Sequence, residues 1–522
     1  MPASTLRAYV DWDRNGNFTG TFDDVTTRVL PSARLEVEYG RDADSPLAAV
    51  VAGEGAFTLT NTDRRYTNRN TGSPLFGKVL PARPVKVERT VSGTPYPCGP
   101  RLHTDSQPLN PDRDTQTVSV RLVDYLADLR GKTLSTAMFT TVRAGAVIGT
   151  ILDAIGWAGA RDLDTGVSVF PFWWEEGTDA LEALDKVLRS EGWPALAYVD
   201  GAGTFVFRDR HHRMFDTTAS TSQATFRASG VEPVMHKRFT EDAGWTSVVN
   251  DATSSVELRR VRDLQVVWES DDAIVVPGGE VVTLVVQLTD PVTEVLVPTQ
   301  NGDLRFEGEV LQSQEDNPGY IRTVPSFTTV TASLSRTSGQ SMILTLTNEG
   351  TTGEDETVTK IVLYGRPVTP TTSVQVSASD ATSITAYGSR GLPNADLPWC
   401  SRYDAQRILD RVVAERKVPL SRLVVTFQIG RTAAGPVSLS AARAAAVLAR
   451  GLCDRVTVVE PESGISGDFY VDRIRHDAAD DLDHVVTMWL DQVPPVVAPA
   501  LASTFTFDTN VAGRRFDSGA FA

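Results

Sequence analysis

The chain has 522 residues, and at roughly 100–200 residues per domain this length predicts about three to five domains. Hydrophobic residues make up 41% and charged residues 22%, which is ordinary globular usage and argues against a disordered or fibrous chain. The formal net charge is −16, and an acidic surface repels phosphate, so a dedicated nucleic-acid binder is disfavoured. With 3 Cys and 6 His, the composition excludes a disulfide framework and argues against a structural zinc site.

The ends of the chain and its hydropathy bear on where the protein folds. The first residues lack the basic start, the apolar core and the small-residue cleavage site of a signal peptide. No window approaches 18 continuous apolar residues, so no membrane segment is predicted. We therefore expect the protein to fold in a cytoplasm, where Cys98, Cys400 and Cys453 stay reduced.

Residues 1–130 are expected to form an all-β domain. Strand-like segments alternate apolar and polar residues and are separated by clusters of Gly, Asn, Asp and Pro. They cover residues 5–12, 25–30, 33–39, 55–61, 84–89 and 117–125. Several short strands without long helices between them favour a barrel or a sandwich.

Residues 131–264 change from the period of a strand to the period of a helix. Residues 144–157 and 178–193 each carry one apolar stripe at helical spacing, and Thr178 is expected to cap the second helix. Residues 195–210 then predict a hairpin with turn residues at its centre. Two amphipathic helices that lead into a hairpin indicate an α+β unit.

Residues 265–380 are rich in β-branched and hydroxyl side chains. The predicted strands have turn signals between them and cover residues 280–288, 292–298, 328–336, 341–348 and 357–368. This spacing of short strands is typical of an Ig-like β-sandwich.

Residues 381–495 combine a helix with strands, and a short tail follows. The helix is predicted over residues 402–417, with Pro419 beyond its end. The strands that follow cover residues 422–429, 455–461, 467–477 and 484–493, and they favour a second barrel. Residues 496–522 form a Pro-rich linker and a tail peptide, whose alternating Phe residues either dock as a strand or stay loose. The predicted fold class is therefore mainly β with α+β content.

The strongest local motif is an oxygen-rich turn near the N-terminus. Calcium needs several oxygen ligands on a short, sharply turned loop, and Gly16 supplies the bend. The twelfth position holds Phe22 in place of the bidentate Glu of an EF-hand-type loop. A polar hairpin turn, in which Asp and Asn cap backbone amides, is therefore the alternative. The candidate calcium ligands are Asp11, Asp13, Asn15, Asn17 and Asp23.

The remaining motifs favour structural roles over ligand binding or catalysis. Residues 72–79 resemble a phosphate-binding loop, but Val79 stands where such a loop needs Ser or Thr. The loop 208–213, which contains His211 and His212, is expected to be exposed and basic and to suit an acidic partner surface. The sequence has neither a G-x-S-x-G nor an H-E-x-x-H motif, so we expect no enzyme activity and no catalytic residues.

Segments spread in order over most of the chain carry a family resemblance. In the first domain they are YVDWDRNGNFT (9–19), DVTTRVL (24–30) and residues 59–87, with Asn61, Asp63, Arg65, Tyr66, Pro74, Leu75, Gly77, Pro81 and the run 82–87 as the most specific positions. Further along they are residues 179–210, 245–255, 387–393, 402–413 and 470–477. The first set resembles minor tail proteins of siphophages that infect actinobacteria, and the second is similar to tail-hub proteins.

The resemblance implies a baseplate-hub fold at the tail tip of a virion. Residues 1–130 and 381–495 would each be similar to a tail-tube subunit, with the helical α+β unit between them and the sandwich inserted on the outside. A homotrimer would then present six barrels in a ring. Such a hub closes the tail tube, connects a six-fold tube to three-fold tip components and opens for DNA ejection.

The resemblance also implies partners and leaves alternatives. The implied partners are the distal tail protein ring, the tape measure protein and other tail-tip proteins, and DNA passes through without specific binding. The net charge of −16 suits that passage, because a cationic channel wall would bind the phosphates. The alternatives are a receptor-binding or adhesive tail-tip protein and a cell-wall-degrading tail-associated hydrolase.

Overall fold

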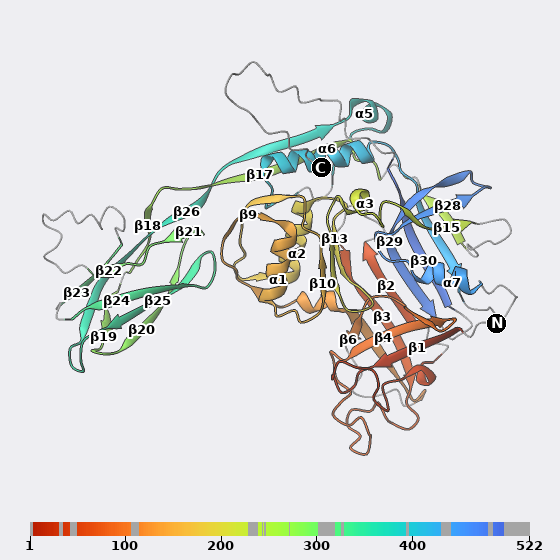
Figure 1. Ribbon diagram of the computed structural model, residues 1–522, viewed down its shortest axis with the longest axis horizontal. Coiled ribbons are helices and arrows are strands. Elements are labelled where there is room, and N and C mark those ends of the chain that lie inside the picture. Colours follow the sequence, from red (N-terminus) through yellow and green to blue (C-terminus); the bar gives the residue numbers. More distant parts are fainter. Residues whose placement is uncertain are drawn as a thin grey trace.

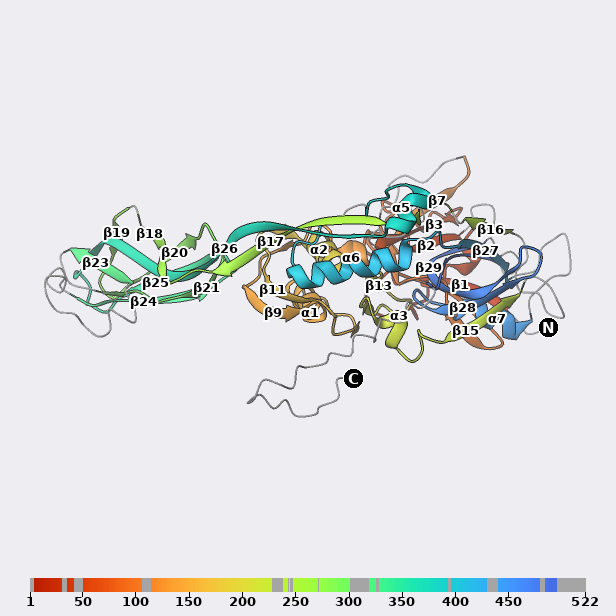
Figure 2. The same ribbon diagram turned by 90° about the horizontal axis from the view of Figure 1, so that it is seen from above.

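The computed structural model of the protein is mainly β and elongated (Figures 1 and 2). It describes residues 4–30, 35–41, 50–105, 114–227, 238–242, 244, 247–270, 272–300, 319–324, 328–392, 396–429, 440–478 and 484–494. A large sheet lies at one end, a helical unit lies in the middle, and a sandwich lies at the other end of a long arm. The C-terminal peptide 496–522, for which a docked strand was one expectation, lies outside the described residues.

The first half of the large sheet comes from the N-terminal part of the chain. Its strands run in the order β1-β4-β6-β7-β3-β2, with β5 paired to β4. Buried and less buried residues alternate along β4 and β7, as expected for strands that cover a core on one face. The elements are β1 (Ser4–Val10), the 3-10 helix η1 (Thr26–Arg28), β2 (Leu35–Arg41), β3 (Val50–Thr60), β4 (Pro84–Val91), β5 (Thr94–Pro97), β6 (Leu102–Thr104) and β7 (Thr117–Asp124).

The second half of the large sheet comes mostly from the C-terminal part of the chain. It continues the path as β2-β29-β30-β27-β16, with β28 on β29 and β15 on β28. The pairing among the described strands therefore joins both halves into one sheet and closes neither into a ring. The elements are β15 (Ser222–Arg227), β16 (Arg238–Asp242), β27 (Arg422–Gln428), α7 (Ala441–Leu448), β28 (Arg455–Glu460), β29 (Ile465–Ala478) and β30 (His484–Gln492).

The helical unit between the halves is built on two packed helices, α1 and α2. Asp179, rather than the expected Thr178, caps α2, because its Oδ1 accepts from the amides of Leu181 at 3.0 Å and Glu182 at 3.3 Å. Gly192 ends α2 with a φ of +89°, which suits a residue without a Cβ. The elements are η2 (Tyr125–Leu129), β8 (Thr133–Leu134), β9 (Phe139–Arg143), α1 (Ala144–Ala154), β10 (Arg161–Leu163), β11 (Val169–Trp173), β12 (Thr178–Asp179), α2 (Ala180–Glu191), β13 (Leu196–Val199), β14 (Phe205–Arg208) and α3 (His212–Phe215).

A two-stranded arm carries the sandwich away from the rest of the molecule (Figure 2). The arm pairs β17 (Asp251–Val261) with the C-terminal part of β26 (Glu356–Ser379), and β26 continues into one of the two sheets of the sandwich. A core of Val, Ile, Leu and Met side chains separates the sheets. The other strands are β18 (Gln265–Glu269), β19 (Ile274–Val276), β20 (Val281–Gln287), β21 (Val292–Val295), β22 (Thr299–Gln300), β23 (Tyr320–Val324), β24 (Val330–Arg336) and β25 (Ser341–Asn348).

The structure distributes some elements differently from the predicted units. β15 and β16 fall within residues 131–264 but pair with β28 and β27 of the large sheet. The predicted helix at 402–417 is α6 (Arg402–Arg416), which follows α5 (Ala381–Tyr387) and packs on the arm rather than on the second half of the sheet. Its expected inner face is buried there: Ile408, Leu409, Val412 and Val413. Pairing partners far away in the chain decide these positions, and local periodicity carries no information about them.

Candidate functional site

The two halves of the large sheet meet where β2 pairs with β29, and we call this pairing the junction. The strands are antiparallel, and their register runs from Leu35 opposite Ala478 to Gly40 opposite Arg473. The partners are separated by more than 400 residues of sequence. Figure 1 shows β2 and β3 beside β29 and β30 at the centre of the large sheet. The junction therefore fixes how the two halves sit relative to each other.

One face of the junction carries a ladder of charged side chains. Successive strand residues point to opposite faces, so Glu36 and Glu38 of β2 share a face with Arg473 and Arg475 of β29. Arg475 pairs with Glu36 at 2.8 Å and with Glu38 at 3.5 Å, and Arg473 also pairs with Glu38. These side chains are partly exposed, so each pair adds little to stability, and the observed register places opposite charges next to each other.

A hollow of about 660 Å³ opens over this charged face. Both acidic and basic groups line it, which makes it suited to a charged surface of another chain rather than to a small apolar ligand. Its charged lining residues are Glu36, Glu38, Arg41, Glu54, Asp105, Arg121 and Arg473.

A buried ion network lies at the end of the junction. Asp472 of β29 accepts a hydrogen bond from Arg213 of α3, and its Oδ1 lies 3.9 Å from Nε of Arg41 at the end of β2. Arg41 also donates to the carbonyl oxygen of Ala195 at 2.6 Å. All three charged side chains are buried. The network thus ties β2, β29 and the helical unit together through one carboxylate.

The charge state of Asp472 follows from its surroundings. Burial raises its pKa, but the guanidinium groups of Arg213 and Arg41 lower it more, and the pKa of Asp472 ends below its usual range. Asp472 is therefore ionised at neutral pH and compensates two buried cations.

The candidate calcium ligands cap backbone amides in their own turn. Asp11 is fully buried, and its carboxylate accepts from the amide of Asn15 at 3.2 Å and of Gly16 at 2.9 Å. The amide oxygen of Asn15 accepts from the amide of Asn17, and that of Asn17 accepts from Thr19. These bonds form the polar turn that was the alternative to the metal site.

The two other carboxylates of this turn point to separate partners. Asp13 forms an ion pair with Lys78 at 2.6 Å, and Asp23 accepts from the amide of Gly20 at 2.7 Å. Burial raises the pKa of Asp23, and the neighbouring carboxylates of Asp11 and Asp13 add to that rise. Calcium binding stays a prediction, which calorimetric titration with Ca²⁺ tests. Heat that is lost in Asp13→Ala would support the site, and no heat in either protein would rule it out.

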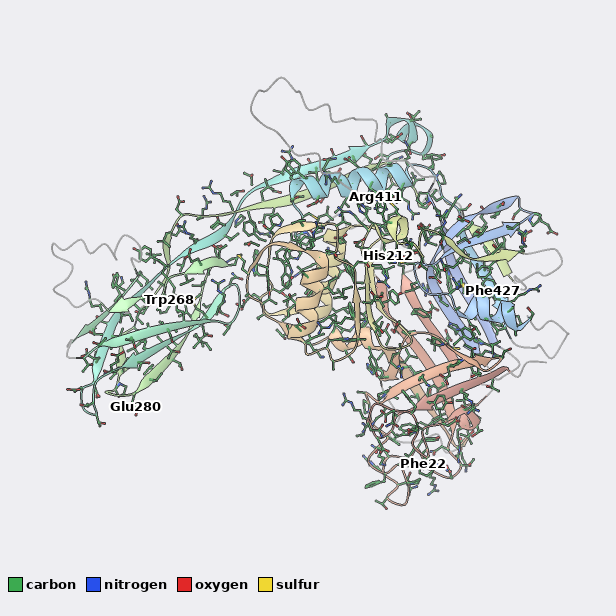
Figure 3. All side chains as sticks on the ribbon, in the orientation of Figure 1. Phe22, His212, Trp268, Glu280, Arg411 and Phe427 are labelled. Carbon is green, nitrogen blue, oxygen red and sulfur yellow. The ribbon has the colours of Figure 1, made fainter. Side chains whose placement is uncertain are left out.

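The loop 208–213 is not the exposed basic loop that the sequence predicts. Arg210 and Arg213 are buried, and Arg210 donates to the carbonyl oxygen of Glu191 and to Ser168, each at 2.6 Å. His212 Nδ1 lies 2.9 Å from the carboxylate of Asp164. Figure 3 shows His212 close to α6, from which Arg411 donates to the carbonyl oxygen of Arg210 at 2.7 Å. The cations are buried because distant acids and carbonyls compensate them, which sequence composition does not reveal.

One set of metal-ligating side chains was missed by the sequence analysis. Among the described residues, a single group of three or more His, Cys, Asp or Glu has its ligand atoms within 4.8 Å of one another: Cys98, His476 and His484. His476 and His484 are eight residues apart, a spacing that suggests a shared strand pair, but nothing in the sequence links them to Cys98.

Comparisons with known proteins find likeness in structure but not in sequence families. No family model matches the chain, and no curated protein matches it either. The chain is similar to the tail protein from Neisseria meningitidis MC58, at 10% identity and a TM-score of 0.48 over 94% of this chain and 97% of that one. It is also similar to the 43 kDa tail protein of prophage MuSo2 from Shewanella oneidensis, at 12% identity and a TM-score of 0.44 over 94% and 98% of the two chains. For prophage tail protein gp18 from Listeria monocytogenes EGD-e, the identity is 8% and the TM-score 0.41 over 95% and 97%.

In the part of the chain that the structure describes, no helix is long and apolar enough to cross a membrane.

Proposed function

We propose that the protein is a structural component of a phage tail and forms a homotrimeric hub at the tail tip. The junction carries this proposal, because it places two β halves, one from the N-terminal part and one mostly from the C-terminal part of the chain, edge to edge in one sheet. Three chains would present six such halves around an axis, which suits contact with a six-fold tube. The resemblance of the sequence segments to minor tail and tail-hub proteins supports the same function.

The partners in this proposal are the distal tail protein ring, the tape measure protein and other tail-tip proteins. The charged hollow over the junction supports a role in contacts between chains, since a lining of both acidic and basic groups favours a surface with complementary charges. DNA would pass through the ring without specific binding, in keeping with the net charge of −16.

The oligomeric state tests the proposed hub. We expect mass photometry of the purified protein to show a trimer, and three-fold density at the tip of the tail in images of the particle. A monomer in solution together with density elsewhere in the particle would contradict the proposal. The charge-reversal variant Glu54→Lys probes the hollow, because Glu54 lines it and is exposed, and we expect it to weaken assembly into tails while β2 and β29 stay paired.

A second candidate function, adhesion to a receptor, is favoured by one feature of the sandwich. β20 exposes valine side chains on its outer face, with Val281 54% and Val285 78% exposed, although strands usually bury such residues. The long arm places this face far from the junction (Figure 2).

The geometry of the arm allows the two functions to be separated. Val261 and Val368 are cross-strand partners, so an Asn-Gly turn can replace residues 262–367 and close the arm as a hairpin. Tails that assemble with this variant but fail to adsorb would favour adhesion by the sandwich. Tails that assemble and adsorb normally would exclude it and leave the hub function alone.

A further inference from the structure

Three side chains from both halves of the large sheet converge inside the protein beside the junction. His476 lies on β29 and His484 is the first residue of β30, where it pairs with Ala478. His476 pairs with Val37 of β2, so it belongs to the junction itself. Cys98 comes from the other half, in the segment between β5 and β6, where its amide donates to the carbonyl oxygen of Val87 at 2.9 Å. All three are buried.

The backbone beside Cys98 is shaped for this approach. Gly99 has a φ of +110°, and a Cβ at this position would lie 2.5 Å from Cγ1 of Val37. Only glycine lets the segment come so close to β2. This close approach brings the Cys98 thiol to the two imidazoles. The three side chains therefore lie close together because of the backbone path, and not only because of their rotamers.

The spacing of the ligand atoms fits a tetrahedral ion. Two nitrogens bound to Zn²⁺ at about 2.0–2.1 Å lie roughly 3.3–3.4 Å apart, and a nitrogen and a sulfur bound at about 2.3 Å lie roughly 3.6 Å apart. Nδ1 of His476 and Nε2 of His484 are 3.2 Å apart, and all three ligand atoms lie within 4.8 Å of one another. The two facing nitrogens are therefore close to the required spacing, and the sulfur of Cys98 lies within 4.8 Å of a ring nitrogen of each histidine.

We propose that Cys98, His476 and His484 bind a Zn²⁺ ion that links the two halves of the large sheet. One thiolate and two imidazoles are a ligand set that Zn²⁺ prefers, and a water molecule completes the tetrahedron in three-ligand zinc sites. The proposal goes beyond the hub function and does not depend on it.

The buried setting favours the neutral imidazole that binds a metal, but it opposes ionisation of the thiol. Burial lowers the pKa of His476 to about 4, so its imidazole is neutral, which is the form that binds metals. Burial raises the pKa of the Cys98 thiol to about 12, against the opposing charge of Arg89. Binding therefore replaces the thiol proton by the ion, and that proton is released to solvent.

The metal content and a cobalt spectrum test the site directly. We expect one zinc per chain by mass spectrometry of the purified full-length protein. Exchange of zinc for Co²⁺ should give tetrahedral d–d bands and a thiolate-to-cobalt charge-transfer band, and Cys98→Ser should remove the charge-transfer band. Cys400→Ser is the matched control, because Cys400 is also a buried free cysteine but lies outside the group. We expect it to keep the band.

The melting temperature provides a second test, which compares each protein with and without a chelator and therefore does not require the variants to be equally stable. A chelator should lower the Tm of the wild-type protein and of Cys400→Ser, and it should leave the Tm of Cys98→Ser unchanged. The alternative to a bound metal is a direct hydrogen bond between the two imidazoles, which the 3.2 Å distance also allows. Wild-type protein that takes up neither Zn²⁺ nor Co²⁺, or cobalt spectra identical in all three proteins, would overturn the proposal.

Discussion

Replacing Asp472 by alanine is expected to destabilise the junction by about 3–5 kcal/mol, because breaking a buried ion network leaves uncompensated charge. Asp472 is the carboxylate that faces both Arg41 and Arg213, and all three side chains are buried. Without it, the buried guanidinium groups of Arg41 and Arg213 lose the carboxylate that they share. The measurement is native-state hydrogen exchange at the amides of β2 and β29, which reports the local free energy of opening.

Asp468→Ala is the matched control for Asp472→Ala. Asp468 lies on the same strand and pairs with Arg455 at 2.6 Å, but both side chains are about a quarter exposed. A solvated pair of this kind contributes about 0–1 kcal/mol. Equal losses in the two variants would show that the buried network costs no more to break than a surface pair, and the proposed role of Asp472 would be wrong.

The pH dependence of the Asp472 contribution has a definite sign. Its pKa in the folded protein lies below the value of an unfolded aspartate, about 3.9. The stabilisation is therefore fully present above about pH 4 and is lost as the pH falls through the lower, folded pKa. Asp472→Ala should consequently reduce the difference between neutral and acidic pH at the junction, where Glu36 and Glu38 also pair with arginines, while it leaves the sandwich unaffected.

The secondary structure of this chain could be predicted well, but its assembly into sheets could not. The stripe of Val147, Ile148, Ile151 and Leu152 defines α1, because a helix buries one face at a period of 3.6 residues. No such local signal states that β2 pairs with β29. That pairing depends on the match of two strands far apart in sequence, and the matching pattern of Glu36 and Glu38 with Arg473 and Arg475 is recognisable only once the register is known.

The candidate site shows the same limit for buried polar groups. The Asp and Asn residues of the turn at 11–23 could be recognised because their spacing is local, although sequence alone left both capping and calcium open. The network of Arg41, Arg213 and Asp472 could not be recognised, because Arg and Asp are residue types that usually lie on the surface. The expectation of an exposed loop at 208–213 was wrong for this reason.

Gly40→Ala is expected to open the junction at a cost of about 3–5 kcal/mol, from backbone strain and overpacking together. Gly40 has a φ of +123° and lies opposite Arg473. A Cβ there would lie 2.4 Å from the carbonyl oxygen of Asp472 and 2.7 Å from Cα of Arg473. Both neighbours are backbone atoms of the facing strand, so the clash is relieved only if β2 and β29 separate.

Gly93→Ala separates the effect of the clash from the effect of the backbone angle. Gly93 lies in the turn between β4 and β5 with a φ of +87°, and a Cβ there has no atom within 4 Å. We expect this control to cost about 1–2 kcal/mol, the strain of a left-handed residue alone. Gly40→Ala should abolish exchange protection in β2 and β29 while β20 and β25 of the sandwich keep theirs. Protection at the junction that survives in Gly40→Ala as well as in Gly93→Ala would mean that Gly40 does not pack against the backbone of β29. The pairing on which the hub proposal rests would then have to be abandoned.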